Sequence, residues 1–226
     1  MGRTNLILDN LISEGRSKPF IVVMETSAAT KPGETPPQPP RAKPSGKGQA
    51  AQGKQPAARP RFRFSFDTYV ELMINDLIPF IDDNFRTLSD QGSRAMAGLS
   101  MGGMQTLNVA MSHLGKFSYI GVFSSGVFGM APQKAKPGAE PSPKAAPSVS
   151  WEEEHQATLN DAGLKKDLKL LWFATGADDF LVDTTRTTVE MLKKHGFSPV
   201  YKETGGGHTW INWREYLNEF APQLFQ

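Results

Sequence analysis

The stretch that decides the fold is "RAMAGLSMGGMQTLNVAM", residues 94–111, in which a serine lies between glycines. The small and apolar residues before Ser100 predict a short strand, and those after it predict a helix. Residues 98–102, "GLSMG", match G-x-S-x-G, which is typical of a sharp strand-to-helix turn that holds the serine in strained geometry. Side chains at either glycine would collide with the neighbouring strand and helix, so we expect glycine to be needed at both positions.

Helix and strand patterns alternate along the rest of the chain. The expected helices are 4–15, 66–85, 101–114, 184–196 and 210–225, and the expected strands are 20–25, 93–100, 119–126, 168–176 and 199–204. We expect Pro79 either to kink its helix or to begin a second helical segment. Alternating strands and helices predict an α/β fold, with a mainly parallel sheet covered on both faces.

Two proline-rich tracts interrupt this alternation, at residues 27–65 and 131–149, and together they hold 13 of the 17 prolines. Such composition buries too little apolar surface to offset the entropy lost on ordering. We interpret the tracts as flexible low-complexity insertions in a single domain that spans residues 1–226, with a tether or an active-site lid as the functional alternative.

Charge and composition exclude several classes of protein. The formal net charge is +2, but the tracts carry +7 and +2, which leaves −7 on the remainder and argues against a preformed nucleic-acid-binding face. No apolar run reaches the length of a membrane span, and we recognise no signal peptide. The absence of cysteine excludes disulfides and cysteine-zinc sites, whereas localisation, cytoplasmic or secreted, stays open.

A serine hydroxyl is a poor nucleophile until a base accepts its proton, so Ser100 requires a histidine. His208 is the best candidate, because it follows "ETGGG" between an expected strand and an expected helix, where a loop can carry the imidazole over the sheet edge. His113, His155 and His195 are interpreted as surface or helix-end residues.

A carboxylate must then orient His208, and "FATGADDFLVD" supplies three aspartates directly after the strand 168–176. Strand-end loops are where such acids lie, which favours Asp178 or Asp179, while Asp183 is better suited to capping the next helix. The residue pattern alone leaves the choice between Asp178 and Asp179 open.

Six segments together resemble, in order, the esterase D-like branch of the α/β-hydrolases, which contains feruloyl and acetyl-xylan esterases (carbohydrate esterase family one). They are "NLILDNLISEG", "FIVVM", "NDLIPFIDDNF", "RAMAGLSMGG", "FSYIGVFSSG" and "GGGHTWINWREYL". The resemblance implies a three-layer α/β-hydrolase sandwich, with Ser100 as nucleophile, His208 as base, Asp179 as orienting acid and the Met101 N–H as an oxyanion donor. It also implies hydrolysis of short-chain acyl or hydroxycinnamoyl esters, without metal or organic cofactor.

The chain departs from this family at its N-terminus. Family members carry strands before the helix that resembles residues 5–15, and one of them lies between the strands that resemble 20–25 and 93–100. The loop after that strand supplies a second oxyanion amide, so the resemblance implies an N-terminally shortened sheet. Our hypothesis is that 20–25 pairs directly with 93–100, and that the second amide comes from the Thr26–Ser27 turn or from a homodimer partner that completes the sheet.

Aromatic residues near these segments suggest where substrate binds. Trp210 and Trp213 could border an aromatic acyl pocket, with helix packing as an equal alternative for Trp210 and the favoured one for Trp213. Phe128 and Trp151 flank the second tract and could belong to a lid.

The expected substrate is a small-molecule ester, with carbohydrate-linked esters among the candidates. Two alternatives stay open: a truncated, non-catalytic remnant that acts as a binding or oligomerising module, and a thioesterase of the S-formylglutathione hydrolase type or an acyl transferase.

Overall fold

The computed structural model describes residues 2–25, 66–128 and 150–226. The expected insertions at 27–65 and 131–149, and the turn at Thr26–Ser27, lie outside the described residues. Within the described ranges, no helix combines the length and the apolar character that crossing a bilayer requires.

A four-stranded parallel sheet forms the centre of the molecule, in the order β1-β2-β3-β4. The strands are β1 (Ala95–Leu99), β2 (Tyr119–Phe123), β3 (Leu170–Gly176) and β4 (Val200–Thr204). All three neighbouring pairs are parallel, so the carboxyl ends of the strands share one edge of the sheet. The prediction of a parallel sheet is confirmed.

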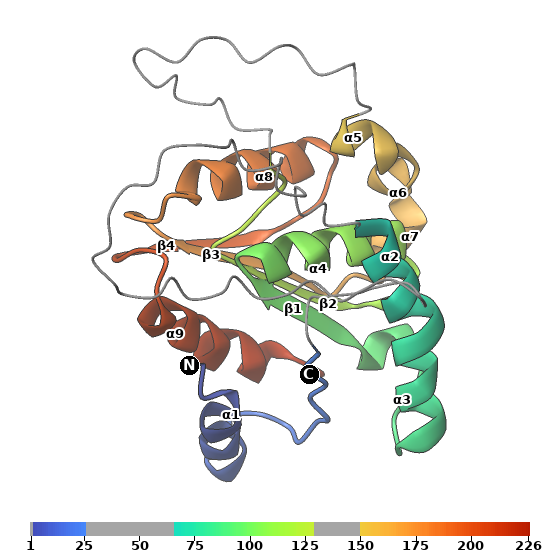
Figure 1. Ribbon diagram of the computed structural model, residues 1–226, viewed down its shortest axis with the longest axis vertical. Helices are drawn as coiled ribbons and strands as arrows, with labels where there is room; N and C mark the ends of the chain where they lie inside the picture. Colours follow the sequence, from blue (N-terminus) through green and yellow to red (C-terminus); the bar gives the residue numbers. More distant parts are fainter. Residues whose placement is uncertain (1, 26–65, 129–149) are drawn as a thin grey trace, which may run out of the picture.

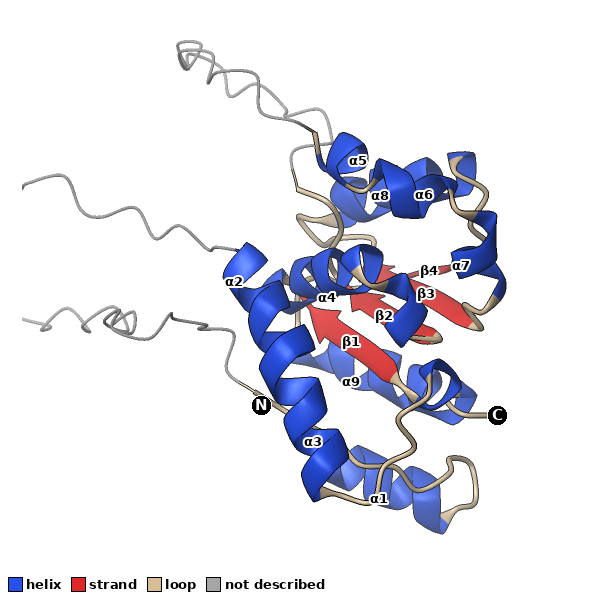
Figure 2. Ribbon diagram, turned by 90° about the vertical axis from the view of Figure 1, so that its right-hand side faces the viewer, coloured by secondary structure: helices blue, strands red, loops and turns tan. Residues whose placement is uncertain are grey.

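Helices cover both faces of the sheet (Figures 1 and 2). On one face lie α2 (Phe66–Glu71), α4 (Met101–Ser112), α8 (Val182–Lys194) and the short helices α5 (Trp151–Glu154), α6 (Gln156–Asn160) and α7 (Ala162–Lys166). On the other lie α9 (Trp210–Phe220) and α1 (Thr4–Ser13), which packs on α9. Single 3-10 turns occur at Gln91–Ser93, Leu114–Lys116 and Ala221–Gln223.

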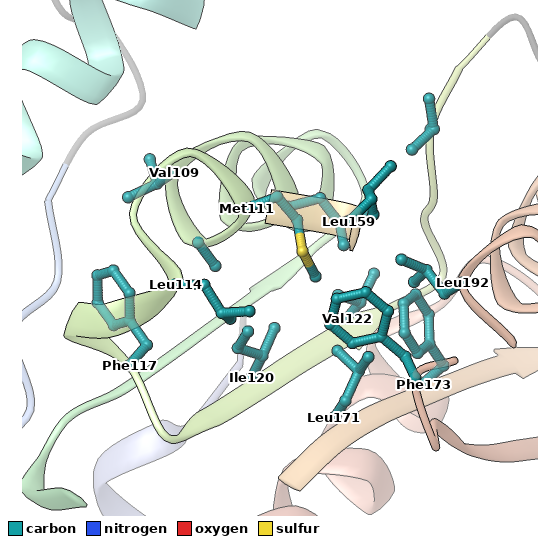
Figure 3. Close-up of a cluster of buried hydrophobic side chains, with 14 of the residues drawn as sticks. Val109, Met111, Leu114, Phe117, Ile120, Val122, Leu159, Leu171, Phe173 and Leu192 are labelled. Carbon is teal, nitrogen blue, oxygen red and sulfur yellow. The ribbon is translucent and has the colours of Figure 1, made fainter. Parts of the chain in front are cut away.

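Two core clusters lie on opposite faces of the sheet, because its central strands are buried on both faces, and a third, small cluster of Leu8, Leu11 and Ala221 packs at α1. Ile120 and Val122 of β2 point into the larger cluster, under α4 and α8 (Figure 3). Tyr119 and Phe123, which alternate with them, join a largely aromatic cluster against α9. This aromatic cluster also contains Trp172, Ala174, Tyr216, Phe220 and Leu224. The aromatic cluster thus packs the sheet against α9, which begins two residues after His208.

The expected helix 66–85 is divided into three segments. A π-helical stretch, Leu72–Leu77, joins α2 to α3 (Ile78–Asn84), and Pro79 occupies the first turn of α3. Proline has no N–H to donate within a helix and is tolerated in a first turn, which explains why a new segment begins there. Of the two outcomes expected for Pro79, the structure has the second.

The predicted strand 20–25 is wrong, because these residues belong to neither a strand nor a helix. Phe20 packs edge-on against Phe225 beside the aromatic cluster, whereas the Glu25 carboxylate accepts a hydrogen bond of 2.5 Å from the Tyr69 hydroxyl on α2. The segment thus runs from one helical layer to the other. No described strand pairs with it, and apolar residues without a strand partner do not make a strand. The hypothesis that 20–25 pairs with the strand containing Ala95–Leu99 is also wrong.

Candidate active site

Ser100 lies at the turn between β1 and α4, with φ 53° and ψ −122°. Positive φ is strained for a residue other than glycine. The Ser100 N–H donates a 2.9 Å hydrogen bond to the Phe123 carbonyl at the end of β2, which helps to hold this conformation. A Cβ at Gly98 would lie 2.2 Å from the Gly102 carbonyl oxygen. Residue 98 must therefore be glycine for the turn to close.

The expectation that Gly102 is also needed to avoid a collision is wrong. A Cβ at Gly102 would meet no atom within 4 Å, because this residue faces open space on the first turn of α4. A Cβ at Gly103 would instead lie 2.5 Å from the Ser125 Cβ. The close packing of this turn depends on Gly98 and Gly103.

Three residues from three loops form a continuous hydrogen-bonded chain. The His208 Nε2 lies 2.9 Å from the Ser100 Oγ, and the His208 Nδ1 lies 3.0 Å from both carboxylate oxygens of Asp179. A carboxylate only accepts, so Nδ1 carries the proton and Nε2 is left to accept the Ser100 hydroxyl proton. This tautomer is the one that lets a histidine act as a base toward a serine.

The loops that carry Asp179 and His208 are packed directly against each other. A Cβ at Gly176, where β3 ends, would lie 2.1 Å from the carbonyl oxygen of Gly206. Asp179 is only 2% exposed, and one of its oxygens also accepts a hydrogen bond of 2.8 Å from the Leu181 N–H. The carboxylate is therefore fixed from two directions before it meets the imidazole.

The structure brings Asp179 to His208 and leaves the other two aspartates away from it. Asp178 is exposed, and its N–H donates to the Gly206 carbonyl at 3.0 Å. Asp183 lies within the first turn of α8 and pairs with Arg186 at 3.1 Å, so it occupies the turn and not the cap.

The other three histidines make contacts elsewhere. His155 caps the C-terminus of α5, so it is a helix-end residue as expected, but it is buried and not on the surface, because Trp151 stacks on its ring and the Ser112 hydroxyl lies 3.3 Å away. His195 follows α8 and pairs with Glu152 at 2.7 Å. Burial, and then the nearby charge of Lys116, lower the pKa of His113.

The amide of Met101 opens α4 directly after Ser100. The first N–H groups of a helix have no partner within the helix, and the helix dipole makes this end attractive to negative charge. The Met101 N–H is thus suited to receive an oxyanion formed next to Ser100.

No group of three or more potential metal ligands occurs among the residues with described positions.

Two aromatic rings, those of Phe180 and Trp213, contact the His208 imidazole. The Phe180 ring lies 4.5 Å from the His208 ring between centroids, and Trp213 meets His208 nearly at right angles at 4.9 Å. Trp210 packs edge-on against Trp213 at 5.0 Å and is 43% exposed. Phe180, which is 76% exposed, was missed by the sequence analysis, although its place next to Asp179 in "DDFL" was the available signal.

None of the described ring contacts joins Trp151 or Phe128 to this aromatic group. The Trp151 Nε1 donates to the Asn108 Oδ1 of α4 at 3.1 Å, and its ring packs on the larger core cluster. Phe128 is half-exposed and follows Val127, whose N–H donates to the Thr188 hydroxyl at 2.8 Å. The contacts of Trp151 are therefore those of a packing residue.

Comparison with known proteins identifies the family. The family described as "Putative esterase" matches residues 1–224. The endo-1,4-beta-xylanase/feruloyl esterase of Xylanibacter ruminicola is 30% identical over 228 aligned positions, which cover 100% of this chain. This chain spans only 24% of that relative's length.

Solved structures share the fold. A ferulic acid esterase of carbohydrate esterase family one from Anaeromyces mucronatus, in complex with ferulic acid, aligns with a TM-score of 0.63 and 20% identity, over 96% of this chain and 69% of that one. The S-formylglutathione hydrolase of Staphylococcus aureus aligns with a TM-score of 0.51 and 17% identity, over 71% of this chain and 66% of that one. The family match spans nearly every residue, and the chain belongs to the esterase family, with the α/β-hydrolase fold.

Proposed function

We propose that this chain is a serine carboxylic-ester hydrolase in which Ser100, His208 and Asp179 form the catalytic triad. The observation that carries the proposal is the pair of contacts on His208, at 2.9 Å to the Ser100 Oγ and 3.0 Å to the Asp179 carboxylate. The family match supports the same activity.

In the proposed mechanism, the Ser100 Oγ attacks the ester carbonyl carbon while its proton passes to the His208 Nε2. The Met101 N–H stabilises the oxyanion, and Asp179 stabilises the imidazolium. The tetrahedral intermediate then expels the alcohol, which takes the proton from His208. Water attacks the acyl-enzyme with His208 again acting as base, which releases the acid and restores Ser100.

The proposed substrates are short-chain acyl or hydroxycinnamoyl esters, including carbohydrate-linked ones. The half-exposed Trp210 and the exposed ring of Phe180 supply apolar aromatic surface on the same side as His208. Such surface favours a planar aromatic acyl group. Comparing kcat/KM for methyl ferulate with kcat/KM for methyl acetate tests this preference, and equal values would contradict it.

The triad itself is tested with p-nitrophenyl acetate and the variant Ser100→Ala. We expect the substitution to lower kcat on the order of 10⁶-fold, to the level set by binding and the oxyanion donor alone. Equal rates in the two proteins would contradict the proposal and favour a non-catalytic module. Faster turnover of a thioester than of its oxygen ester would keep the triad and move the substrate class to thioesters.

We also propose that β1 mediates a homodimer. The Arg94 carbonyl and the Ser100 N–H bond to β2, so by strand alternation the backbone groups of Ala95, Ala97 and Leu99 point to the other side. No described strand pairs with that side of β1. An open strand edge is a template for pairing with a second chain.

A further inference from the structure

Two serines at the carboxyl edge of the sheet share a strained backbone, and the proposed mechanism uses only one. Ser100 directly follows β1 with φ 53°, and Ser124 directly follows β2 with φ 49°. Ser124 is fully buried, and its N–H donates to the Ala174 carbonyl at 2.7 Å. A non-glycine residue keeps positive φ only when its surroundings impose it, which marks Ser124 as a candidate for a functional role.

The Ser124 side chain contacts the aromatic group at His208. Its Oγ accepts a hydrogen bond of 2.9 Å from the Trp213 Nε1. The Trp213 ring in turn meets the His208 ring with an interplanar angle of 88° and a centroid separation of 4.9 Å. The contacts therefore run from β2, through the indole, to the imidazole.

His208 itself has few other restraints. Gly205, Gly206 and Gly207 precede it, and Gly206 has a positive φ of 84°, so the backbone of this loop is intrinsically permissive. Hydrogen bonds hold Nδ1 at Asp179 and Nε2 at Ser100, but neither bond stops the ring from rotating about the line that joins the two nitrogens. Phe180 packs against the imidazole at an interplanar angle of 44° and is itself largely exposed. Trp213, anchored in the core, limits this tilt.

We propose that Ser124 and Trp213 are a positioning pair, which holds the His208 ring in the orientation that directs Nε2 at the Ser100 Oγ. This inference rests on the proposed esterase function. None of the described hydrogen bonds or ring contacts joins the pair to Ser100, so we expect its removal to lower kcat and to leave KM for a small ester unchanged.

The test uses the full chain with Trp213→Phe, Ser124→Ala and the double variant, assayed with p-nitrophenyl acetate. Each single substitution removes the 2.9 Å hydrogen bond and keeps the neighbouring side chain. We expect each to lower kcat about threefold to tenfold, the range that one hydrogen bond controls. The double variant should lose no more kcat than the less active of the two single variants, because both single substitutions remove the same hydrogen bond.

Two further measurements separate positioning from packing. The rate of inactivation by phenylmethylsulfonyl fluoride should fall by the same factor as kcat, because it depends on the Ser100–His208 pair and not on ester binding. Ser124→Gly should lower kcat as much as Ser124→Ala, although glycine relieves the strained φ. Trp172→Phe is the matched control: Trp172 lies in the same aromatic cluster without a described ring contact to His208, so it should lower the melting temperature and leave kcat unchanged.

Unchanged kcat in Trp213→Phe and Ser124→Ala, alongside an inactive Ser100→Ala, would overturn this inference and leave the esterase function intact. Multiplied losses in the double variant would also overturn it. Equal activity of Ser100→Ala and the wild type would instead overturn the proposed function on which it rests.

Discussion

Asp178 and Asp179 are adjacent and chemically identical, yet only the second reaches His208. We predict that Asp179→Asn lowers kcat on the order of 10⁴-fold, because the amide can donate to Nδ1 and stabilise the wrong tautomer. Asp178→Asn is the matched control, and its kcat should stay within about threefold of wild type, as for other exposed substitutions. Steady-state assays with p-nitrophenyl acetate decide the matter, and equal losses in the two variants would contradict the assignment.

At the scale of single residues, the sequence predicted what local pattern determines. The turn motif located Ser100, and the glycine-rich loop located His208. The residue pattern left Asp178 and Asp179 open, because spacing does not encode the direction of a side chain after β3, and only the family resemblance pointed to Asp179. Ser124 escaped prediction because a serine after a strand is ordinary in sequence, and only its φ of 49° and its contact with Trp213 make it unusual.

The turn after β1 allows a prediction at the scale of one element. Gly98→Ala should lower the free energy of unfolding by about 3 kcal/mol and reduce kcat, because the new Cβ would lie 2.2 Å from a backbone oxygen and displace Ser100. Gly102→Ala meets no atom within 4 Å and should change stability by less than about 0.5 kcal/mol. Urea unfolding of both variants measures the difference, and the reverse order would contradict the structure.

The hydrogen bond between Tyr69 of α2 and Glu25 of the segment 20–25 predicts a pH dependence. Burial, and then the hydrogen bond to Glu25, raise the pKa of the Tyr69 hydroxyl in the folded state. The folded protein thus holds this proton more tightly than the unfolded chain. The resulting stability is fully present below the unfolded pKa, about 10, and is lost as the pH rises from there through the folded pKa.

Tyr69→Phe should therefore be less stable than wild type at pH 8, by about 0.5–1.5 kcal/mol for the lost hydrogen bond. The difference should shrink as the pH rises above about 10. Urea unfolding at several pH values measures this difference in the free energy of unfolding.

Tyr201→Phe should behave in the same way, because burial and then a hydrogen bond to Glu203 also raise the pKa of Tyr201. A difference that stays constant up to pH 11 would contradict this account.

Helices and buried strands were predictable because their patterns are internal to each segment. In β2, apolar side chains enter two core clusters alternately, and this produces the continuous apolar run seen in the sequence. The segment 20–25 has the same kind of run, but a strand also requires a neighbour, and neighbours are a property of the whole sheet. The π-helical stretch Leu72–Leu77 could not be predicted from the sequence either, because a proline marks a break in a helix without specifying the type of turn before it.

At the scale of the whole molecule, the open side of β1 determines how two chains could associate. The Ala97 N–H points away from β2, so proline at this position removes a donor from the open edge and keeps the β1–β2 hydrogen bonds. Ala97→Ser keeps the N–H and serves as the control.

If β1 pairs with β1 of a second copy, sedimentation equilibrium should give a dimer for wild type and Ala97→Ser, and a folded monomer for Ala97→Pro.

The dimer also bears on catalysis, because Ser100 directly follows β1, where a partner's amide could serve as the second oxyanion donor. Loss of one such donor costs on the order of 10²- to 10³-fold in kcat. Turnover per chain should then fall by that factor on dilution below the dimer dissociation constant, and equally in Ala97→Pro. A monomeric Ala97→Pro with wild-type kcat would keep the dimer and exclude the shared donor, whereas a monomeric wild type would exclude both.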